Sequence, residues 1–569
     1  MKRLICFLLT IVLLGALAGC GGAESLLSEA DALAKLDAYM DKKISTNIVA
    51  HDSDTSWVGS EESMNELPPI EKYPFSVEGT SAINVEIFSS TEKSDAKTDR
   101  WFDQMAREFN AAAKEVNGRR VSVSIRPMSS GLALDFIQTR TYIPTAYTPS
   151  NELWGRMIEA KGIRTKLIEQ RLTGNTAGIM MEPNAYKDYI DKYGEVTMPK
   201  VMEAVFSGDI DLGHTDPNTS STGLVFLALE LLASDSNNPF GTTAIEKFRQ
   251  FQKMTPAASP TTAELIKVAD KGILNAIIMS PSEWSRYPTL SKWVFTPLGV
   301  RQDSPLYALE GASDEEQEVL KLFAEYCKQQ SSQNAANSLG FNQFDDFWGE
   351  DIGFSGSELF SAQDIWKKNK DGGDPVISVI VMDCSGSMDT PDRLPKAKRA
   401  LLSSIPHTNE DNYIGLISYS STDRINIDLP LVKQTETGEL ELARFDGKRQ
   451  AMFAGAVKDL KAGGATATNS AIGAALHMAK EAKALAPNAK IRILVFTDGA
   501  TNMDQVSFGE IEGIVHGLGI PIYGVFFMPE KPSDMDELIK LTAINEGYTI
   551  DADNEDVVYK LQGLFRIEL

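Results

Sequence analysis

The stretch that decides the fold is an apolar run ending in a polar loop, Val376-Ile377-Ser378-Val379-Ile380-Val381-Met382-Asp383-Cys384-Ser385-Gly386-Ser387. Such a run, followed by glycine and hydroxyl residues, predicts a buried strand and the turn after it. One carboxylate and two hydroxyls alternate along the turn, at Asp383, Ser385 and Ser387. Hard divalent cations prefer oxygen ligands. The loop therefore predicts a metal site with a coordination position left open.

Two further polar loops flank expected strands and helices in the same part of the chain. They read Gly463-Gly464-Ala465-Thr466-Ala467-Thr468 and Phe496-Thr497-Asp498-Gly499. In an open parallel sheet, ligands gather at the carboxyl ends of the strands. We expect the three loops to meet there, where they supply two carboxylates, several hydroxyls, and glycines that let the backbone come close.

The three motifs, in this order and spacing, resemble the metal-ion-dependent adhesion site of von Willebrand factor A domains. The resemblance covers about residues 372–569 and implies five site residues: Asp383, Ser385, Ser387, Thr466 and Asp498. In that family the first three face the ion, the threonine contributes a hydroxyl, and the last carboxylate often acts through water. Many members have threonine directly after the two glycines. Here Ala465 intervenes, so Thr468 is a rival to Thr466.

A cation held by so few charged ligands stays under-neutralised, with one position filled only by water. A carboxylate of a partner protein can replace that water, and chelators would then abolish binding. Mg²⁺ is the first choice of ion, because it suits several waters and few carboxylates. Ca²⁺ and Mn²⁺ remain open. The alternative is a site that only stiffens the domain or that has lost its ion.

The C-terminal module (residues 375–569) alternates strand and helix patterns. Runs that are apolar at every residue fit strands covered on both faces. The sequence predicts a doubly wound, Rossmann-like parallel sheet, with strands at Ile377–Met382, Tyr413–Tyr419, Ile491–Phe496 and Ile520–Phe527. Helices are expected at Lys396–Ser404, Ala451–Lys461, Asn469–Ala486, Phe508–Gly517 and Asp534–Ile544.

The central module (residues 81–350) also alternates strands and helices, which implies a mostly parallel sheet with covering helices. Strands are expected at Ile83–Phe88 and Val121–Ile125, and a helix at Arg100–Val116. Residues 351–374, which are polar and contain glycine and aspartate, are interpreted as a linker between the modules. The overall fold class is therefore α/β.

Several expected strand-to-helix junctions of the central module carry small hydroxyl residues. Helix N-termini leave N–H groups unpaired, which can bind anions or polar ligands. The same residue types are also preferred helix caps. Eight residues are candidates for ligand binding: Ser89, Ser90, Ser129, Ser130, Ser150, Asp216, Ser220 and Ser221.

Residues 80–345 resemble the extracellular solute-binding proteins of bacterial ABC importers. The segment Thr215-Asp216-Pro217 through Gly223 looks like a segment of the sulfate- and molybdate-type members. The resemblance implies two α/β lobes that close over a small solute in a hinged cleft. The candidate loops contain no clear arginine, which leaves anion binding open.

The N-terminus reads as an export signal. Lys2 and Arg3 precede an apolar run that is too short to span a bilayer. It ends in Leu17-Ala18-Gly19-Cys20, which resembles the bacterial lipobox. Residues 1–20 are therefore expected to be a lipoprotein signal peptide, with Cys20 carrying the lipid on the outer face of the cell membrane. Residues 21–80 are interpreted as a linker or spacer, with a helix near Leu26–Lys43.

Composition restricts the partners and the chemistry. A net charge of −24 over 569 residues argues against nucleic acid, whose phosphates need basic patches. Cys327 and Cys384 lack zinc or dithiol spacing, and Cys384 is expected to point into the core. No nucleophile elbow, Walker loop or zinc-protease motif is present. His214 is read as a surface or cap-adjacent histidine, so no enzyme is expected.

The sequence thus predicts a lipid-anchored binding protein that contacts the membrane through its lipid only. The C-terminal module would bind an acidic side chain of a protein partner through its ion. The central module would take a small polar solute or serve as a docking surface. The alternative is a solute receptor of an ABC-type importer, in which the metal module only docks to a partner.

Overall fold

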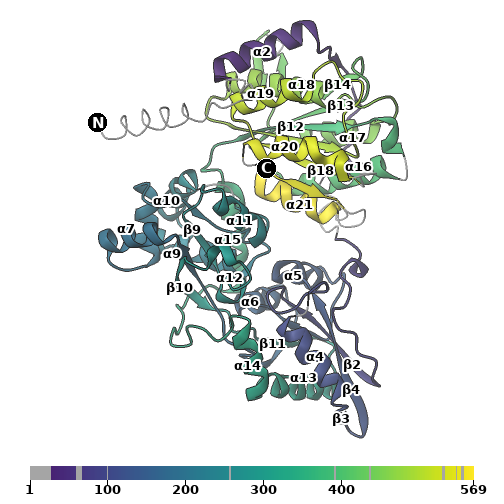
Figure 1. Cartoon of the computed structure of the whole chain (residues 1–569). Helices are drawn as coiled ribbons and strands as arrows, with labels where there is room; N and C mark the ends of the chain where they lie inside the picture. Colours follow the sequence, from purple (N-terminus) through teal and green to yellow (C-terminus); the bar gives the residue numbers. More distant parts are fainter. Residues whose placement is uncertain are drawn as a thin grey trace, which may run out of the picture.

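The computed structural model describes residues 27–58, 67–98, 100–255, 258–389, 392–434, 438–527, 532–545, 547–552 and 557–569. The predicted signal peptide and its lipidation site, Cys20, lie outside these ranges. Within them the chain forms two α/β modules, drawn above and below one another in Figure 1. No helix within these ranges is both long and apolar enough to cross a bilayer.

The C-terminal module is built on a seven-stranded sheet in the order β1-β14-β13-β12-β17-β18-β19. Only β13 and β14 pair antiparallel; the other neighbours are parallel. The strands are β1 (Asn47–Ile48), β12 (Val376–Asp383), β13 (Tyr413–Tyr419), β14 (Ile425–Leu429), β17 (Lys490–Thr497), β18 (Ile522–Phe526) and β19 (Thr549–Asp551). A separate hairpin pairs β15 (Val432–Gln434) with β16 (Leu440–Leu442).

Helices cover both faces of this sheet, which explains why β12 is apolar at almost every position. Ile380 and Met382 enter one core, whereas Val379 and Val381 enter the other, because successive strand residues point to opposite faces. The helices are α16 (Arg393–Ser404), α17 (Gly447–Asp459), α18 (Thr468–Leu485), α19 (Phe508–Leu518), α20 (Asp536–Ile544) and α21 (Val557–Glu568). The predicted doubly wound sheet is confirmed.

The central module has two lobes, each with its own sheet. The six-stranded sheet runs β3-β4-β2-β5-β11-β6 and the four-stranded sheet β10-β7-β9-β8. Their strands are β2 (Ile83–Ser89), β3 (Glu115–Val116), β4 (Arg119–Pro127), β5 (Ala146–Thr148), β6 (Thr165–Glu169), β7 (Thr176–Met181), β8 (Leu212–Gly213), β9 (Ala276–Met279), β10 (Val294–Arg301) and β11 (Leu306–Leu309). The chain crosses between the lobes after β6 and again after β10. The two connecting segments between these strands and the next form the hinge. The predicted two-lobed α/β architecture is confirmed.

Helices pack around both lobes. The first lobe carries α4 (Trp101–Ala111), α5 (Ser130–Gln138), α6 (Leu153–Ala160), α13 (Asp314–Cys327) and α14 (Gln330–Ser338). The second carries α7 (Pro183–Tyr193), α8 (Met198–Phe206), α9 (Ser221–Ser234), α10 (Thr242–Met254), α11 (Thr262–Asp270) and α12 (Pro281–Trp284). The helix predicted at Arg100–Val116 is shorter than expected, because the chain turns after Ala111 and Glu115–Val116 pairs with β4.

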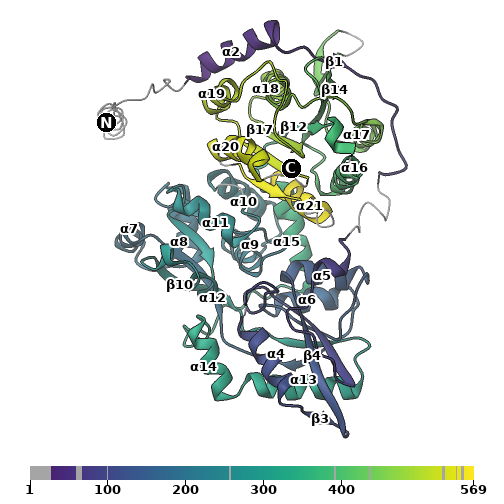
Figure 2. The same cartoon turned by 45° about the vertical axis from the view of Figure 1, so that its right-hand side comes forward.

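The helix expected near Leu26–Lys43 is confirmed, but the interpretation as a spacer is wrong over residues 27–58, which we term the N-terminal strap. Its helix α2 (Glu29–Lys42) packs against α19, and β1 adds a parallel strand beside β14. Leu36 is fully buried in the core of the C-terminal module, and the Trp57 indole donates a hydrogen bond to the Leu402 carbonyl at 2.7 Å. Figure 2 shows α2 lying along this module. The strap is bound because α2 packs its apolar side on helices α18 and α19, and β1 pairs with the edge strand β14.

The predicted linker at 351–374 is also wrong, because it contains a packed helix, α15 (Gly356–Asn369). This helix contacts α6 and α9. Trp366 is 1% exposed and lies in a small core with Ile567 of α21. The polar face that suggested a linker is real, but its apolar side joins the two modules.

Helix α21 lies where the modules meet, and both views place it beside the central module (Figures 1 and 2). Arg566 donates to Asp216 from Nη2 at 2.9 Å and from Nε at 3.2 Å, and both residues are buried. Two residues on, Glu568 pairs with Arg492 of β17 at 2.9 Å. One helix thus bonds ionically to both modules. The remaining short turns are η2 (Ile70–Lys72), η3 (Pro288–Leu290), η4 (Gly386–Asp389), η5 (Ile405–His407) and η6 (Pro532–Met535).

Removal of one partner of the Arg566–Asp216 pair should strongly destabilise the junction. We expect Arg566→Met to cost about 3–5 kcal/mol, because the Asp216 charge stays buried without its partner. The double variant Arg566→Met/Asp216→Leu should recover most of this loss. The exposed pair of Arg444 and Asp411 (2.6 Å) provides the control, and Arg444→Met should cost less than about 1 kcal/mol. Urea denaturation followed by circular dichroism measures all three; equal effects of Arg566→Met and Arg444→Met would contradict the expectation.

The strap should bind in a pH-dependent manner through His51, whose ring lies 2.9 Å from Asp428 and 3.0 Å from Asp459. Burial lowers the pKa of His51, but hydrogen bonds to the two carboxylates outweigh it and the pKa is raised. A raised pKa in the folded state stabilises the protein below the unfolded value of about 6.5, and this contribution is lost as the pH rises through the folded value.

We therefore expect His51→Gln to lower the free energy of unfolding by about 1–2 kcal/mol at pH about 5.5. The loss should be smaller at pH about 8.5, and melting temperatures measured at both pH values check the difference. His477→Gln is the control, because the His477 ring lies farther from its carboxylate, at 3.8 Å from Asp37, and is more exposed. A His51→Gln effect of the same size at both pH values would refute the role of the protonated ring.

Candidate functional site

A cluster of oxygen atoms lies at the carboxyl ends of β12 and β17. The Ser385 and Ser387 hydroxyl oxygens are 3.0 Å apart. Ser387 donates to Asp498 Oδ1 at 2.9 Å, although the two residues are 111 positions apart in the chain. Parallel strands β12 and β17 are direct neighbours, so the loops that follow them meet. Three of the five predicted site residues therefore contact one another.

Asp383, the fourth, lies at the end of β12 and is fully buried. Its Oδ1 accepts from the Ser385 amide at 2.7 Å and its Oδ2 from the Thr497 hydroxyl at 2.7 Å. Burial is the largest effect on the pKa of Asp383, and the nearby Asp498 acts in the same direction. Together they raise this pKa to about 6, against the lowering effect of the hydrogen bonds. The site thus concentrates negative charge in a place where water is scarce.

Arg393, at the start of α16, is a charged neighbour that the motifs did not reveal. Its Nη1 donates to Asp498 Oδ2, and the pair is buried. Asp498 therefore divides its two oxygens between Arg393 and Ser387. The guanidinium balances the charge of Asp498, whereas Asp383 has no cationic side chain among its hydrogen-bond partners in the described residues.

The Gly-Gly loop approaches the cluster through its backbone. The Gly386 amide donates to the Gly464 carbonyl at 3.0 Å, and the Gly463 amide donates to the Cys384 carbonyl at 2.8 Å. Gly464 has a φ of +102°, and a Cβ there would lie 2.8 Å from the Ser421 hydroxyl. Only glycine allows this approach, because it tolerates positive φ and has no side chain.

The two candidate threonines have different surroundings. The Thr466 hydroxyl accepts from Asn502 Nδ2 at 3.2 Å and makes no hydrogen bond to the other four site residues in the described part of the chain. The Thr468 hydroxyl lies 3.1 Å from the hydroxyl of the buried Tyr419. Thr468 thus belongs to the first turn of α18 and its packing, whereas Thr466 stays on the loop. The loop position favours Thr466 over Thr468 as the threonine that would provide an oxygen ligand to a cation.

The donor set suits a hard cation. Its oxygens belong to carboxylates and hydroxyls. Because Arg393 already balances the charge of Asp498, the remaining negative charge is too small to neutralise a divalent ion fully. Within the described residues no group of three or more His, Cys, Asp or Glu side chains could hold a metal. A metal here would therefore depend on serine and threonine hydroxyls beside the two carboxylates. Cys384 is buried, as predicted, and takes no part.

A second candidate site is a cavity of about 240 Å³ between the lobes of the central module. Six of the eight predicted ligand-binding residues line it: Ser90, Ser129, Ser130, Ser150, Ser220 and Ser221. They come from the N-termini of α5 and α9 and from the loops after β2 and β5. Two predictions are wrong. Ser89 is fully buried and bonds to Ser94 at 2.7 Å, and Asp216 is turned away to Arg566.

The hydroxyls of this interlobe cavity form a connected network across the hinge. Trp154 Nε1 donates to Ser221 Oγ at 2.8 Å, and Ser221 donates to Ser130 Oγ at 3.2 Å. Ser130 also accepts from the Ser150 amide at 3.4 Å. Residues of both lobes are thus joined at the floor of the cavity, which gives it a defined shape.

Among the lining residues that sequence reasoning did not select for ligand binding, three carry a carboxylate or a side-chain amide: Glu92, Glu283 and Gln302. Glu92 lies in the loop after β2, close to Ser90, and Glu283 lies in α12, whose N-cap is Ser280. Their closeness to hydroxyl residues in the sequence was a signal that could have identified both glutamates. Gln302 lies on the second crossing between the lobes, for which the sequence offers no pattern. His214 is buried rather than on the surface, and its Nδ1 lies 3.0 Å from the Thr215 carbonyl oxygen.

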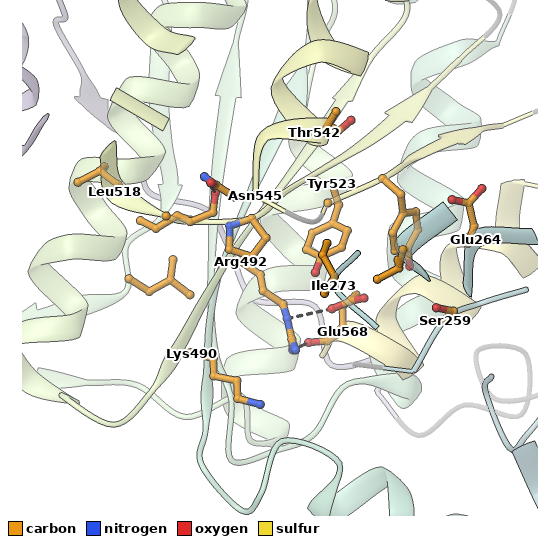
Figure 3. Close-up of a pocket in the computed structure, with 18 of the residues that line it drawn as sticks. Ser259, Glu264, Ile273, Lys490, Arg492, Leu518, Tyr523, Thr542, Asn545 and Glu568 are labelled. Carbon is orange, nitrogen blue, oxygen red and sulfur yellow. Dashed lines mark hydrogen bonds and ion pairs between the residues drawn. The ribbon is translucent and has the colours of Figure 1, made fainter. Parts of the chain in front are cut away.

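A larger cavity, of about 1040 Å³, separates the two modules. Figure 3 shows Ser259 and Glu264 of the central module facing Tyr523, Arg492 and Glu568 of the C-terminal module. Pro260 lines both this junction cavity and the interlobe cavity. The segment that leads into α11 therefore forms a wall common to the two cavities.

Comparison with known proteins gives one family match, within the C-terminal module. Residues 378–500 match the family model of the von Willebrand factor type A domain. A von Willebrand factor type A protein from Catenulispora acidiphila is 22% identical with a TM-score of 0.27, over 34% of this chain and 42% of that one. The chain thus spans less than half of that protein. No curated protein matches the chain.

The chain is also similar to solved structures of solute-binding proteins. The sulfate-binding protein SubI from Mycobacterium tuberculosis H37Rv is 12% identical, with a TM-score of 0.33, over 46% of this chain and 88% of that one. Iron-bound HitA from Pseudomonas aeruginosa is 12% identical, with a TM-score of 0.37, over 51% of this chain and 99% of that one. These similarities describe the fold and carry no statement about the ligand.

Proposed function

We propose that this protein is an exported, lipid-anchored, non-enzymatic binding protein with two ligand sites. Its C-terminal module binds an acidic side chain of a protein partner through a divalent cation, and its central module takes a small polar ligand. The supporting observation is the contact among the Ser385, Ser387 and Asp498 oxygens, next to buried Asp383, at the end of the sheet in a region that matches the von Willebrand factor type A domain.

The residues that would hold the ion are Asp383, Ser385, Ser387, Thr466 and Asp498. Mg²⁺ is the preferred candidate, because it keeps several waters and needs few carboxylates; Ca²⁺ and Mn²⁺ are the alternatives. When bound, the ion supplies a Lewis-acidic position that a partner carboxylate can fill. The chain itself contributes orientation: the Thr497 hydroxyl and Ser385 amide fix Asp383, and Arg393 fixes Asp498.

The role of Arg393 follows from charge balance. Two buried carboxylates beside one another repel, and the guanidinium reduces that cost when no cation is bound. Because Asp498 is already balanced, a divalent ion beside Asp383 retains excess positive charge. That excess would attract an incoming carboxylate. Arg393 thus supports both the stability of the ion-free cluster and the acidic preference of the site.

The alternative function, a solute receptor of an importer, is favoured by the interlobe cavity, which is lined by six of the predicted ligand-binding serines. In that case the metal site would serve only to dock the receptor. Because the metal site contacts a partner in both cases, removal of the cation does not separate the two functions; they differ in whether partner binding or solute capture is the main task.

Cation binding should stabilise the C-terminal module and should depend on Asp383. We expect Mg²⁺ or Mn²⁺ at one hundred times its dissociation constant to add about 2.7 kcal/mol, relative to EDTA. Asp383→Ala should abolish this gain in a thermal-shift assay. Asp389→Ala, which removes an exposed carboxylate from the same loop, is the matched control and should keep it.

Partner recognition is tested on arrays of peptides in which every acidic residue has an amide counterpart. Binding should require Mg²⁺ and should be limited to the acidic members. Equal binding in EDTA, or to acidic and amide peptides alike, would overturn the proposed mechanism.

The two threonines should respond differently to loss of the hydroxyl. Thr466→Val should weaken Mg²⁺ binding about tenfold or more with little change in melting temperature. Thr468→Val should lower the melting temperature, because it breaks the bond to buried Tyr419, and should leave Mg²⁺ affinity nearly unchanged. Isothermal titration calorimetry and thermal melts distinguish the two; the reverse pattern would make Thr468 the donor.

A further inference from the structure

The interlobe cavity is lined by groups that differ in what they can bind. Its described lining contains hydroxyl residues, two glutamates, one tyrosine and one glutamine, but no lysine, arginine or histidine. At about 240 Å³ it is below the range of about 300–1,000 Å³ typical of drug-sized ligands. The ligand is therefore small, and its charges must match the charges that line the cavity.

One side of the cavity offers hydrogen-bond donors. Helices α5, α9 and α11 begin there, and their capping residues Ser129, Ser220 and Thr261 all line it. Helix N-termini present unpaired N–H groups and partial positive charge. Gln302, which is 2% exposed, has a side-chain amide nitrogen with no hydrogen-bond partner in the described residues. A buried donor without a partner is costly, so it points to an acceptor oxygen on the ligand.

The other side offers carboxylates. Glu92 accepts from Ser90 at 2.6 Å, and its charge is balanced by the fully buried Lys93, 3.4 Å away. Glu283 accepts from Thr262 at 3.1 Å and from Arg286 at 3.3 Å.

Arg286 provides only partial balance for Glu283, because it makes a single contact of 3.3 Å from a side chain that is 33% exposed. Arg100 is the other cation that acts on Glu283, and it is already paired with Asp95 at 2.9 Å. Burial and then Glu92 raise the pKa of Glu283 to about 7, so this carboxylate lacks sufficient positive charge around it.

We propose that the interlobe cavity binds a small zwitterion of the size and charge pattern of a free α-amino acid. The ligand carboxylate lies at the N-termini of α5, α9 and α11 and accepts from Gln302. The ligand ammonium lies at Glu283. This assignment rests on the proposed function, in which the central module takes a small polar ligand, and it specifies which one.

Two other ligand classes fit less well. A divalent oxyanion such as sulfate would meet two carboxylates and no lining cation in the described cavity wall. A neutral sugar would bury Glu283 without supplying the missing positive charge, which is unfavourable in a site of low dielectric. The zwitterion satisfies both the donors and the carboxylate.

Isothermal titration calorimetry on the full chain tests the assignment. The probes are glycine, L-alanine, L-serine and L-threonine, with sodium acetate, methylammonium chloride, sodium sulfate and glucose for comparison. At least one amino acid should bind more tightly than every comparison compound. Glu283→Gln, which keeps size and removes charge, should weaken that binding at least about tenfold. Gln302→Met, which keeps volume and removes the donor, should weaken it as well.

Glu264→Gln is the matched control, because Glu264 lies on α11 but faces the junction cavity and Lys267. It should leave the affinity unchanged, and circular dichroism should show that all variants are folded. Tighter binding of sulfate or glucose, or an unchanged affinity in folded Glu283→Gln, would overturn the assignment.

No response to any probe would also overturn it. If Mg²⁺ still raised the melting temperature in that case, the metal-binding part of the proposed function would stand. Conversely, amino-acid binding without any Mg²⁺ response would overturn the metal site and leave the present assignment intact.

Discussion

The buried ion pair between Arg566 and Asp216 is the interaction on which the arrangement of the two modules depends. Two charges removed from water are stable only when they are paired and hydrogen-bonded. Arg566 lies near the end of the chain, and Asp216 lies in the loop before α9, so the pair joins residues 350 positions apart. The last helix of the C-terminal module therefore stays against the central module, and the cap of α9 has a fixed position.

This junction has a consequence for the interlobe cavity. Asp216 also accepts from the Asn218 amide at 2.9 Å, which shapes the loop that leads to Ser220 and Ser221. The segment before α11 separates the interlobe cavity from the junction cavity. A ligand that moves the lobes would therefore act on the contacts of α21. The interlobe cavity and the module junction are therefore connected by a short set of packed residues.

Charge balance explains the polar clusters of both modules. At the end of β12 and β17, Arg393 balances Asp498 and leaves Asp383 unmatched; in the interlobe cavity, Lys93 balances Glu92 and leaves Glu283 only partly matched. Each site thus retains one buried carboxylate whose pKa is raised by burial. In a low-dielectric environment such a group is stabilised by an added cation. The same physical situation appears twice, once among metal-type donors and once beside helix N-termini.

The sequence by itself determined the elements and the metal-type cluster, because both depend on local patterns. Apolar runs predict strands buried on both faces, and the loops after neighbouring parallel strands must meet, so Asp383, Ser385, Ser387 and Asp498 could be placed together in advance. Of the eight residues predicted to bind a ligand from hydroxyl clusters at helix starts, six line the interlobe cavity. The strap, α15, Arg393 and Gln302 could not be predicted. Each depends on a contact between distant parts of the chain, and only tertiary packing decides which exposed-looking polar segment has an apolar side to bury and which charge receives a partner.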